Sequence, residues 1–377
     1  MTMNYQYTHS YKSLHELVAD FVCVSNKGQT ETVKLLLELD HSCGVDPSAL
    51  SNLALREASR NGNTEIVKLL LELDPSRGVD PSAVYNQALT DASSNGHTAI
   101  VKMLLELDPS RGIDPSAVYN KALRDASKNG HKAIVMMLLD LDPSRGVDPS
   151  AVNNEALLDS SRNGHTEIVK ILLELDPSRG VNPSVFNNEI LLRSSKDGHT
   201  EIVKLLLEME PVRGVNPSAD NNRALLEASY EGHTEIVKML LELNPSRGVN
   251  PSVYNNKPLQ VLAVNESVQI IVLFLRLTPS RGVILSRPVV RIIYQYNLLP
   301  LISEEIFNTY DWSINLTMTN VHALLQHRFV SFKRWCMREN NFQRLPRLIK
   351  IVIREYGLTR TQLSRKMKLP HQLDDFL

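Results

Sequence analysis

Apolar residues along most of the chain follow one repeating pattern of two helices and a loop. Between Asn86 and Asn95, apolar residues at helical spacing predict a short first helix, which the Asn-Gly pair ends. Residues 98–107 carry a broader apolar face with Lys and Glu outside it, which predicts a second, more apolar helix. Residues 108–112, Asp-Pro-Ser-Arg-Gly, end this helix because Pro lacks the backbone N–H and Gly adopts left-handed conformations. An irregular loop then leads to the next copy of the pattern.

This pattern returns with a period of 34 residues. Glycines keep this spacing in two series, at positions 28, 62, 96, 130, 164, 198 and 232 and at positions 44, 78, 112, 146, 180, 214, 248 and 282. Asn and Pro residues keep it from Asn52 to Asn256 and from Pro47 to Pro251. Two short helices cannot bury their apolar faces alone, but stacked copies can. The sequence therefore predicts an all-α solenoid of helical hairpins over residues 13–282.

The repeated segment resembles a known family. Residues 163–174, Asn-Gly-His-Thr-Glu-Ile-Val-Lys-Ile-Leu-Leu-Glu, closely resemble the Gly-His-x-x-Val-Val-x-Leu-Leu-Leu segment of ankyrin repeats, and the preceding small pairs such as Ala92-Ser93 resemble the Ala-Ala of that family. The tetratricopeptide repeat, which has the same length, fits poorly because its Trp, Leu-Gly and Tyr pattern is missing. The loop departs from the ankyrin pattern, since Ser-Arg-Gly-Val-Asp/Asn-Pro-Ser replaces Gly-Ala-Asp-Val-Asn.

The resemblance also implies where a partner binds. In ankyrin-like arrays the first helices and loop tips line a concave groove, so first-helix positions that vary between repeats are candidate partner-binding positions. They are occupied by Arg56, Thr90, Asp91, Arg124, Asp125, Leu158, Asp159, Leu192, Arg193, Leu226 and Tyr230. Leu158, Leu192 and Leu226 have two interpretations: an exposed apolar strip in the groove, or packing between neighbouring first helices. The sequence leaves both open.

Two further rows of residues in register are interpreted as structural. His97, His131, His165, His199 and His233 lie one repeat apart, about 10 Å, which is too far to share a metal ion with bonds of about 2 Å. We interpret them as turn and cap residues, and we expect no metal site and no cofactor. Arginines precede the loop glycines, and most of them follow an acidic residue by three positions, as Arg111 follows Asp108. This spacing predicts an ion pair within each turn.

Composition and charge restrict the class of protein. The chain has 377 residues with 42% hydrophobic and 22% charged residues, typical of a folded protein. Three cysteines with no close pair indicate a reducing compartment, and no apolar run approaches the roughly 20 residues of a membrane span. Residues 1–12 are polar, without the apolar core of a signal peptide, and we expect a disordered tail. We expect a cytoplasmic, intracellular protein, with the nucleus as the alternative compartment.

The last part of the chain differs in charge. Residues 283–377 contain 14 Lys and Arg against 7 Asp and Glu, a net of +7, whereas the first 282 residues carry a net of −8. We expect a basic helical module that covers the end of the solenoid. Its basic residues and aromatics also fit a nucleic-acid-binding surface. The candidate phosphate contacts are Lys333, Arg334, Arg338, Arg360, Arg365 and Lys366.

No catalytic pattern of residues appears, neither a phosphate-binding glycine loop, nor a zinc protease motif, nor a nucleophile elbow. The sequence therefore predicts a non-enzymatic scaffold that binds a protein partner on the concave face, with no small-molecule substrate and no membrane. Two alternatives remain open. One is a nucleic-acid-associated protein that uses the basic module. The other is a ubiquitin-ligase substrate adaptor, because residues 345–349 resemble the opening of an F-box.

Overall fold

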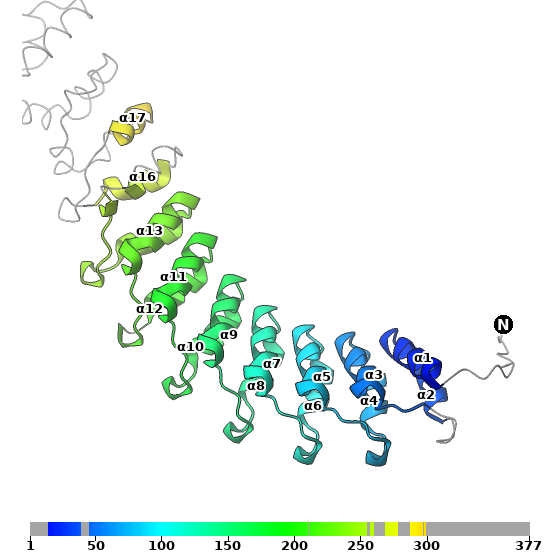
Figure 1. Cartoon of the computed structure of the whole chain (residues 1–377). Coiled ribbons are helices and arrows are strands. Elements are labelled where there is room, and N and C mark those ends of the chain that lie inside the picture. Colours follow the sequence, from blue (N-terminus) through cyan, green and yellow to red (C-terminus); the bar gives the residue numbers. More distant parts are fainter. Residues whose placement is uncertain are drawn as a thin grey trace, which may run out of the picture. The chain divides into compact units, whose positions relative to one another are not determined.

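The computed structural model describes residues 14–38, 45–209, 211–254, 257–259, 268–277, 287–296 and 298. Within these ranges every regular element is a helix (Figure 1), which confirms the all-α prediction. The first helices of the repeats are α1 (Leu14–Asn26), α3 (Ala49–Arg60), α5 (Ala83–Ser94), α7 (Ala117–Lys128), α9 (Ala151–Arg162), α11 (Val185–Asp197) and α13 (Ala219–Glu231). The second helices are α2 (Thr30–Glu38), α4 (Thr64–Leu71), α6 (Thr98–Leu105), α8 (Lys132–Leu139), α10 (Thr166–Glu174), α12 (Thr200–Glu208), α14 (Thr234–Glu242) and α16 (Val268–Leu275).

Contacts divide the chain into two units, Met1–Ile190 with Val212–Gly214, and Leu191–Pro211 with Val215–Leu377. In the first unit, consecutive first helices pack on one another from α1 through α9, and consecutive second helices do so from α2 through α10. In the second unit, α12 packs on α14 and α14 on α16. Within each unit, the array is therefore a stack of helical hairpins, as the repeat pattern predicts.

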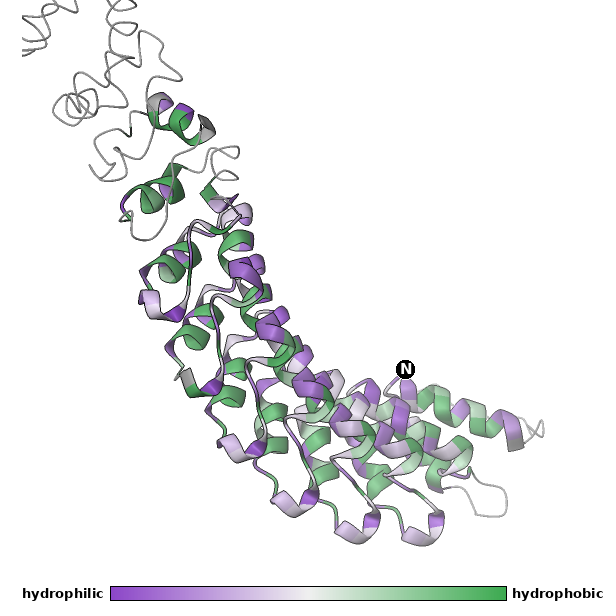
Figure 2. Ribbon diagram, turned by 60° about the vertical axis from the view of Figure 1, so that its left-hand side comes forward, coloured by the Kyte–Doolittle hydropathy of each residue, from purple (hydrophilic) through white to green (hydrophobic). Residues whose placement is uncertain are grey.

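The core lies between the helices of neighbouring repeats. Leu89 on α5 and Ile100 and Leu104 on α6 have no exposed surface, and their equivalents in the other repeats are buried in the same way. Figure 2 shows apolar residues gathered along the helices, while the tips of the long loops are polar. Because each of these side chains fills a closely packed space, truncating one such Leu to Ala costs about 2–5 kcal/mol.

Each long loop contains two turns that the sequence did not specify in detail. The first is a 3₁₀ turn, for example η2 (Pro109–Arg111), in which the Asp108 side chain accepts the N–H of Ser110 and Gly112 adopts a φ of 77°. The same turn recurs as η1 (Pro75–Arg77), η3 (Pro143–Arg145), η4 (Pro177–Arg179), η5 (Pro211–Arg213) and η6 (Pro245–Arg247). No strand occurs in the described part of the loops, so the repeats have helix pairs without a β-hairpin finger there.

The second turn lies at the start of each first helix and is left-handed. In α5, the residues Val84, Tyr85 and Asn86 have φ values of 54°, 56° and 63°. The same three positions have positive φ from α3 to α13. A left-handed conformation costs roughly 1–2 kcal/mol for a residue with a Cβ atom. In α5 the continuous right-handed helix therefore begins only after Asn86, at residue 87.

The Asn of this turn bonds to the loop that leads to the next first helix. An Asn at a helix start commonly accepts N–H groups of that helix, but the partner here is further along the chain. Asn86 is 5% exposed, and its Oδ1 accepts the backbone N–H of Asp114, in the loop between α6 and α7, at 2.9 Å. The equivalent bonds join Asn52 to Asp80, Asn120 to Asp148, Asn154 to Asn182 and Asn222 to Asn250.

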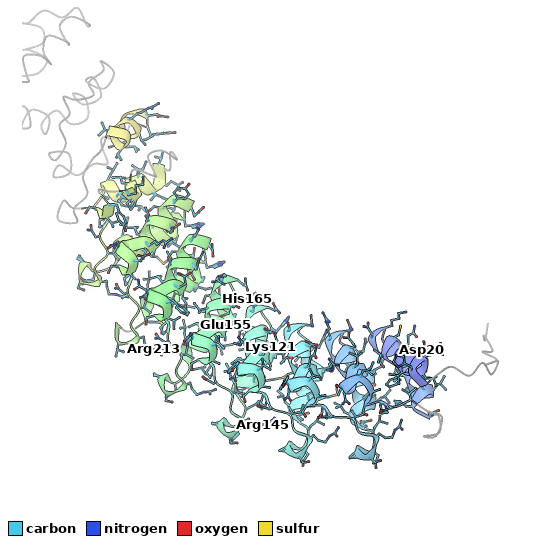
Figure 3. The ribbon with its side chains drawn as sticks, viewed as in Figure 1. Asp20, Lys121, Arg145, Glu155, His165 and Arg213 are labelled. Carbon is cyan, nitrogen blue, oxygen red and sulfur yellow. The ribbon has the colours of Figure 1, made fainter. Side chains whose placement is uncertain are left out.

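The arginines of the loops connect repeats, so the predicted ion pair within the turn is wrong. Arg111 donates to the carbonyl oxygens of Leu71 and Val79, in the preceding repeat, at 3.4 and 3.3 Å. Its expected partner Asp108 instead accepts the N–H of Ser110. Figure 3 shows Arg145 in the loop that follows α8, where it donates to the carbonyl of Ile113. The spacing misled because an Asp two residues before a backbone N–H forms its own closed turn.

The histidines occupy the predicted cap position, but their side chains bond to another repeat. His131 precedes the first residue of α8 and makes no side-chain cap hydrogen bond. Its Nε2 lies 3.0 Å from the carbonyl of Ser94, in the preceding repeat, to which it donates. His97, His165 and His233 make the same contact with Arg60, Lys128 and Lys196.

Several predictions concern the two ends of the chain, where few or no residues are described. Helix α17 (Arg287–Gln295) lies in the segment expected to cover the array, and its residues Val289, Val290, Ile292 and Ile293 are buried. The tail at 1–12 and the basic residues from Lys333 to Lys366 lie outside the described residues. The division into a tail, a solenoid and a basic module stays a prediction.

Candidate partner-binding face

The variable first-helix positions form contacts between repeats as well as a surface. Arg56 on α3 donates to Oε1 of Gln87 on α5 at 2.6 Å. It also donates to the carbonyls of Ser51 and Leu50, in the left-handed turn of its own repeat. Arg56 is thus structural in two ways, because it bonds one repeat to the next and donates to carbonyls of the left-handed turn.

Arg124 repeats this arrangement on α7. Its guanidinium pairs with Glu155 on α9 and donates to the carbonyl of Val118 in its own turn. The Arg124 side chain is only 17% exposed, and its charge is already paired with the Glu155 carboxylate. A partner carboxylate would have to compete with Glu155 for it. Figure 3 shows Glu155 and Lys121, another charged residue of the same face, on the first helices α9 and α7.

Thr90 occupies the same position on α5 but is not at the surface. The residue is 5% exposed, and its hydroxyl donates to the carbonyl of Gln87 at 3.1 Å. Its assignment as a partner contact is therefore wrong for this conformation. A Thr has no charged group to extend past the neighbouring helix, so its hydroxyl is satisfied by its own helix instead.

The acidic residues that directly follow these positions on the first helices are half-buried, and each bonds to another residue of the array. Asp125 bonds to Lys121, and Asp159 lies 3.5 Å from Arg162. Asp91 accepts a hydrogen bond from Nε2 of Gln87 at 3.2 Å. Burial raises the pKa of the Asp91 carboxyl above its ordinary value, against the opposing effects of the Gln87 hydrogen bond and the Arg60 charge.

The three leucines at the variable positions are half-buried. Leu158 on α9, Leu192 on α11 and Leu226 on α13 all have intermediate exposure. This exposure is compatible with both interpretations, contact with a partner and packing beside neighbouring first helices. The remaining candidates do reach the surface, since Arg193 is exposed and Tyr230 is 59% exposed.

The structure also shows exposed residues that sequence reasoning passed over. The left-handed turns carry large apolar side chains at the surface, among them Tyr85 at 79% and Tyr119 at 77% exposure. The one signal in the sequence was that the residue before the repeated Asn, such as Tyr85 before Asn86, differs between repeats. Helical periodicity assigned these positions to a loop, so it made no statement about which way they face.

The described residues contain neither a cluster of metal-ligating side chains nor a membrane-spanning helix. Across the described ranges, His, Cys, Asp and Glu side chains do not gather in threes as a metal site needs. Likewise, none of the helices described above is long and apolar enough to traverse a bilayer.

Stacked helical hairpins with a 34-residue period define a repeat protein whose function depends on its surface. Residues 21–118 and 175–255 match the family described as Ankyrin repeats (3 copies). The chain belongs to the ankyrin-repeat family. Ankyrin repeats generally mediate protein–protein interactions and are typically non-enzymatic. No curated protein matches the sequence significantly.

Proposed function

We propose that this protein is a non-enzymatic scaffold that binds a protein partner on the face formed by its first helices. The observation that carries the proposal is the contrast within one repeat. Positions whose side chains bond to distant parts of the chain, such as Asn86 and Arg111, are the same in successive copies, whereas neighbouring first-helix positions differ in charge and size. Selective recognition of another protein needs this combination: residues that hold the repeats together stay the same, and surface residues on the first helices differ from repeat to repeat.

The contacts described above identify which candidates a partner can reach. Arg193 and Tyr230 are exposed, and Asp91, Asp125 and Asp159 are partly so. Tyr and Arg are the residue types that most often dominate the binding energy of interfaces. We therefore expect Arg193 and Tyr230 to contribute more than the half-buried leucines.

The experiment is a capture assay with the intact chain as bait and mass spectrometry as readout. The variant Arg193→Ala/Tyr230→Ala should retain about tenfold less of the captured partner, since truncation of such residues often costs more than 1–2 kcal/mol. The matched control is Lys102→Ala/Lys170→Ala, which removes two exposed side chains from second helices. Equal retention by the wild type and the first-helix variant would contradict the assignment of this face.

A second candidate function has a specific observation in its favour. Residues 321–371 contain 12 Lys and Arg against 2 Asp and Glu, so they would attract phosphate groups. The test is retention of labelled DNA or RNA by the intact chain across a salt series. Binding that falls with salt and is lost in Lys333→Ala/Arg334→Ala/Arg338→Ala supports it. Absence of salt-dependent retention eliminates it.

A further inference from the structure

The left-handed turns of the first unit expose a row of apolar side chains that the proposed face does not use. We call this row the turn ridge. It consists of Leu50, Val84, Tyr85, Val118, Tyr119, Val152 and Phe186, whose exposed fractions range from 43% to 79%. All of these residues lie within the unit that ends at Ile190, and each occupies one of two positions in its repeat.

The backbone of the turn ridge is unfavourable for the residues that occupy it. Val84, Val118 and Val152 have φ values of 54°, 53° and 52°, where a β-branched residue is a genuine outlier. Later repeats have better-suited residues in the same turn, namely Asn187 beside Phe186 and Asp220 with Asn221. The early repeats thus combine strained backbone with exposed apolar side chains, a combination that folding alone does not favour.

Carboxylates alternate with the apolar residues of the ridge. Asp80 lies between two turns, because its backbone N–H donates to Asn52 of the preceding turn and the turn that contains Val84 follows it. One carboxylate oxygen accepts the N–H and hydroxyl of Ser82 at 2.8 and 2.6 Å. The Asp80 residue is exposed, so its carboxylate is accessible from solvent. Asp46, Asp114 and Asp148 are exposed and bond to their own serines in the same way.

This negative charge is confined to the early repeats. The equivalent residues further along are Asn182, Asn216 and Asn250, and they make the same bonds to the serine that follows. An Asn is therefore sufficient for the turn. The carboxylates at positions 80, 114 and 148 are not needed by the local structure, and they coincide with the exposed tyrosines at 85 and 119.

We propose that the turn ridge binds an extended basic peptide segment in which an apolar residue recurs every three positions with Lys or Arg between. The ridge offers apolar contacts separated by carboxylates, so its complement alternates apolar and cationic side chains. Neighbouring first helices pack about 8–10 Å apart. A peptide in the extended polyproline II conformation advances about 3.1 Å per residue and places every third side chain on the same side, so three residues match one repeat. The proposal rests on the proposed function in that the array binds a polypeptide, and it specifies the chemistry of that partner.

The test uses the intact chain and a fluorescent peptide of about 15 residues with the repeat Leu-Lys-Ser, enough to span the ridge. Fluorescence anisotropy should show binding that weakens as NaCl rises from about 0.05 to about 0.5 M. A peptide of the same composition with its leucines, lysines and serines in separate blocks should bind at least about tenfold more weakly. Equal binding of the two peptides, or no binding of either, overturns the proposal.

The repeats themselves supply variants that should fold. Tyr85→Asn/Tyr119→Asn introduces the residue found at 153, 187 and 221, and it should weaken binding about tenfold or more. Asp80→Asn/Asp114→Asn/Asp148→Asn should weaken binding and remove most of its salt dependence. The control Asp74→Asn/Asp108→Asn/Asp142→Asn removes the same charge from the 3₁₀ turns, where Asn244 shows that Asn is accepted, and should bind like the wild type.

The outcomes separate this inference from the proposed function. If the ridge variants bind the peptide like the wild type, the inference is wrong even where Arg193→Ala/Tyr230→Ala loses the partner. If that first-helix variant keeps its partner while the ridge variants lose the peptide, the ridge is the binding surface and the first-helix assignment is wrong. Circular dichroism and thermal unfolding of each variant check that the fold is retained.

Discussion

The side chain of Asn86 accepts the backbone N–H of Asp114, 28 residues further along the chain, at 2.9 Å. The bond joins the left-handed turn at the start of α5 to the loop between α6 and α7. It explains why Asn keeps its register through the array, since no other uncharged side chain of this length both accepts a bond and tolerates a positive φ.

Removing this bond should destabilise the array locally. We expect Asn86→Ala to lower the free energy of unfolding by about 1–3 kcal/mol, because it leaves a half-buried N–H unsatisfied and places Ala at a φ of 63°. Asn86→Asp keeps an acceptor oxygen and should lose less. Urea unfolding followed by circular dichroism measures both. Equal losses in the two variants would mean that the hydrogen bond is unimportant.

The glycines between the helices have two separable requirements. Gly96 has a φ of 79°, and a Cβ there would lie 2.6 Å from Cε1 of His131, whereas Gly232 has a φ of 82° and no atom within 4 Å. We expect Gly232→Ala to cost about 1 kcal/mol from backbone conformation alone. Gly96→Ala should cost more, since it also displaces the His131 ring from the carbonyl of Ser94.

A double variant separates these two costs by unfolding measurements. Adding His131→Ala to Gly96→Ala relieves the clash, so the two substitutions together should cost less than the sum of their separate effects. Additive costs would show that the ring moves aside without penalty.

Arg111 should act through backbone carbonyls and not through an acidic neighbour. We expect Arg111→Ala to destabilise the protein by about 1–3 kcal/mol, since the carbonyls of Leu71 and Val79 lose a charged donor. Asp108→Asn should have a much smaller effect, because Asn244 makes the same turn bond in a later repeat. Thermal unfolding at low and high salt distinguishes the two roles. Equal, salt-sensitive losses would support the ion pair instead.

Asp91 should make the protein less stable at neutral pH. Burial raises the pKa of its carboxyl, so the folded state binds the proton more tightly than the unfolded state. The sign of the linkage then requires stability to rise as the pH falls through the raised pKa, with no further gain below the unfolded value of about 3.9. Asp91→Asn should therefore be more stable than the wild type at pH 7, and the difference should vanish in acid. A pH series of urea unfolding curves measures this.

The 3₁₀ turns should show the opposite dependence. Hydrogen bonds from Ser76 and Ser110 lower the pKa values of Asp74 and Asp108. Their contribution to stability is fully present above the unfolded pKa of about 3.9 and is lost as the pH falls through the lowered values. Asp74→Asn/Asp108→Asn should flatten the loss of stability in this acid range. An unchanged acid limb in the variant would show that these turns do not contribute.

The repeat, its two helices and most of the core follow from the amino-acid pattern alone. Apolar residues at helical spacing, such as Leu89 and Leu104, are buried because a stacked hairpin has only one place for an apolar face. The period made this inference secure, since each prediction was tested on several copies of the same pattern. It also led to the ankyrin-repeat family, through the segment at 163–174.

The bonding partners of the constant polar residues follow from the three-dimensional arrangement of the repeats. Arg111, His131 and Asn86 bond to residues 28 to 40 positions away, whereas a sequence pattern favours partners nearby in the chain because it contains no distances between copies. The same limit applies to exposure. Thr90 is buried and Tyr85 is exposed, and the left-handed turn at the start of α5 separates the two positions. Helical periodicity does not predict such a turn, so it cannot assign the direction of side chains on either side of it.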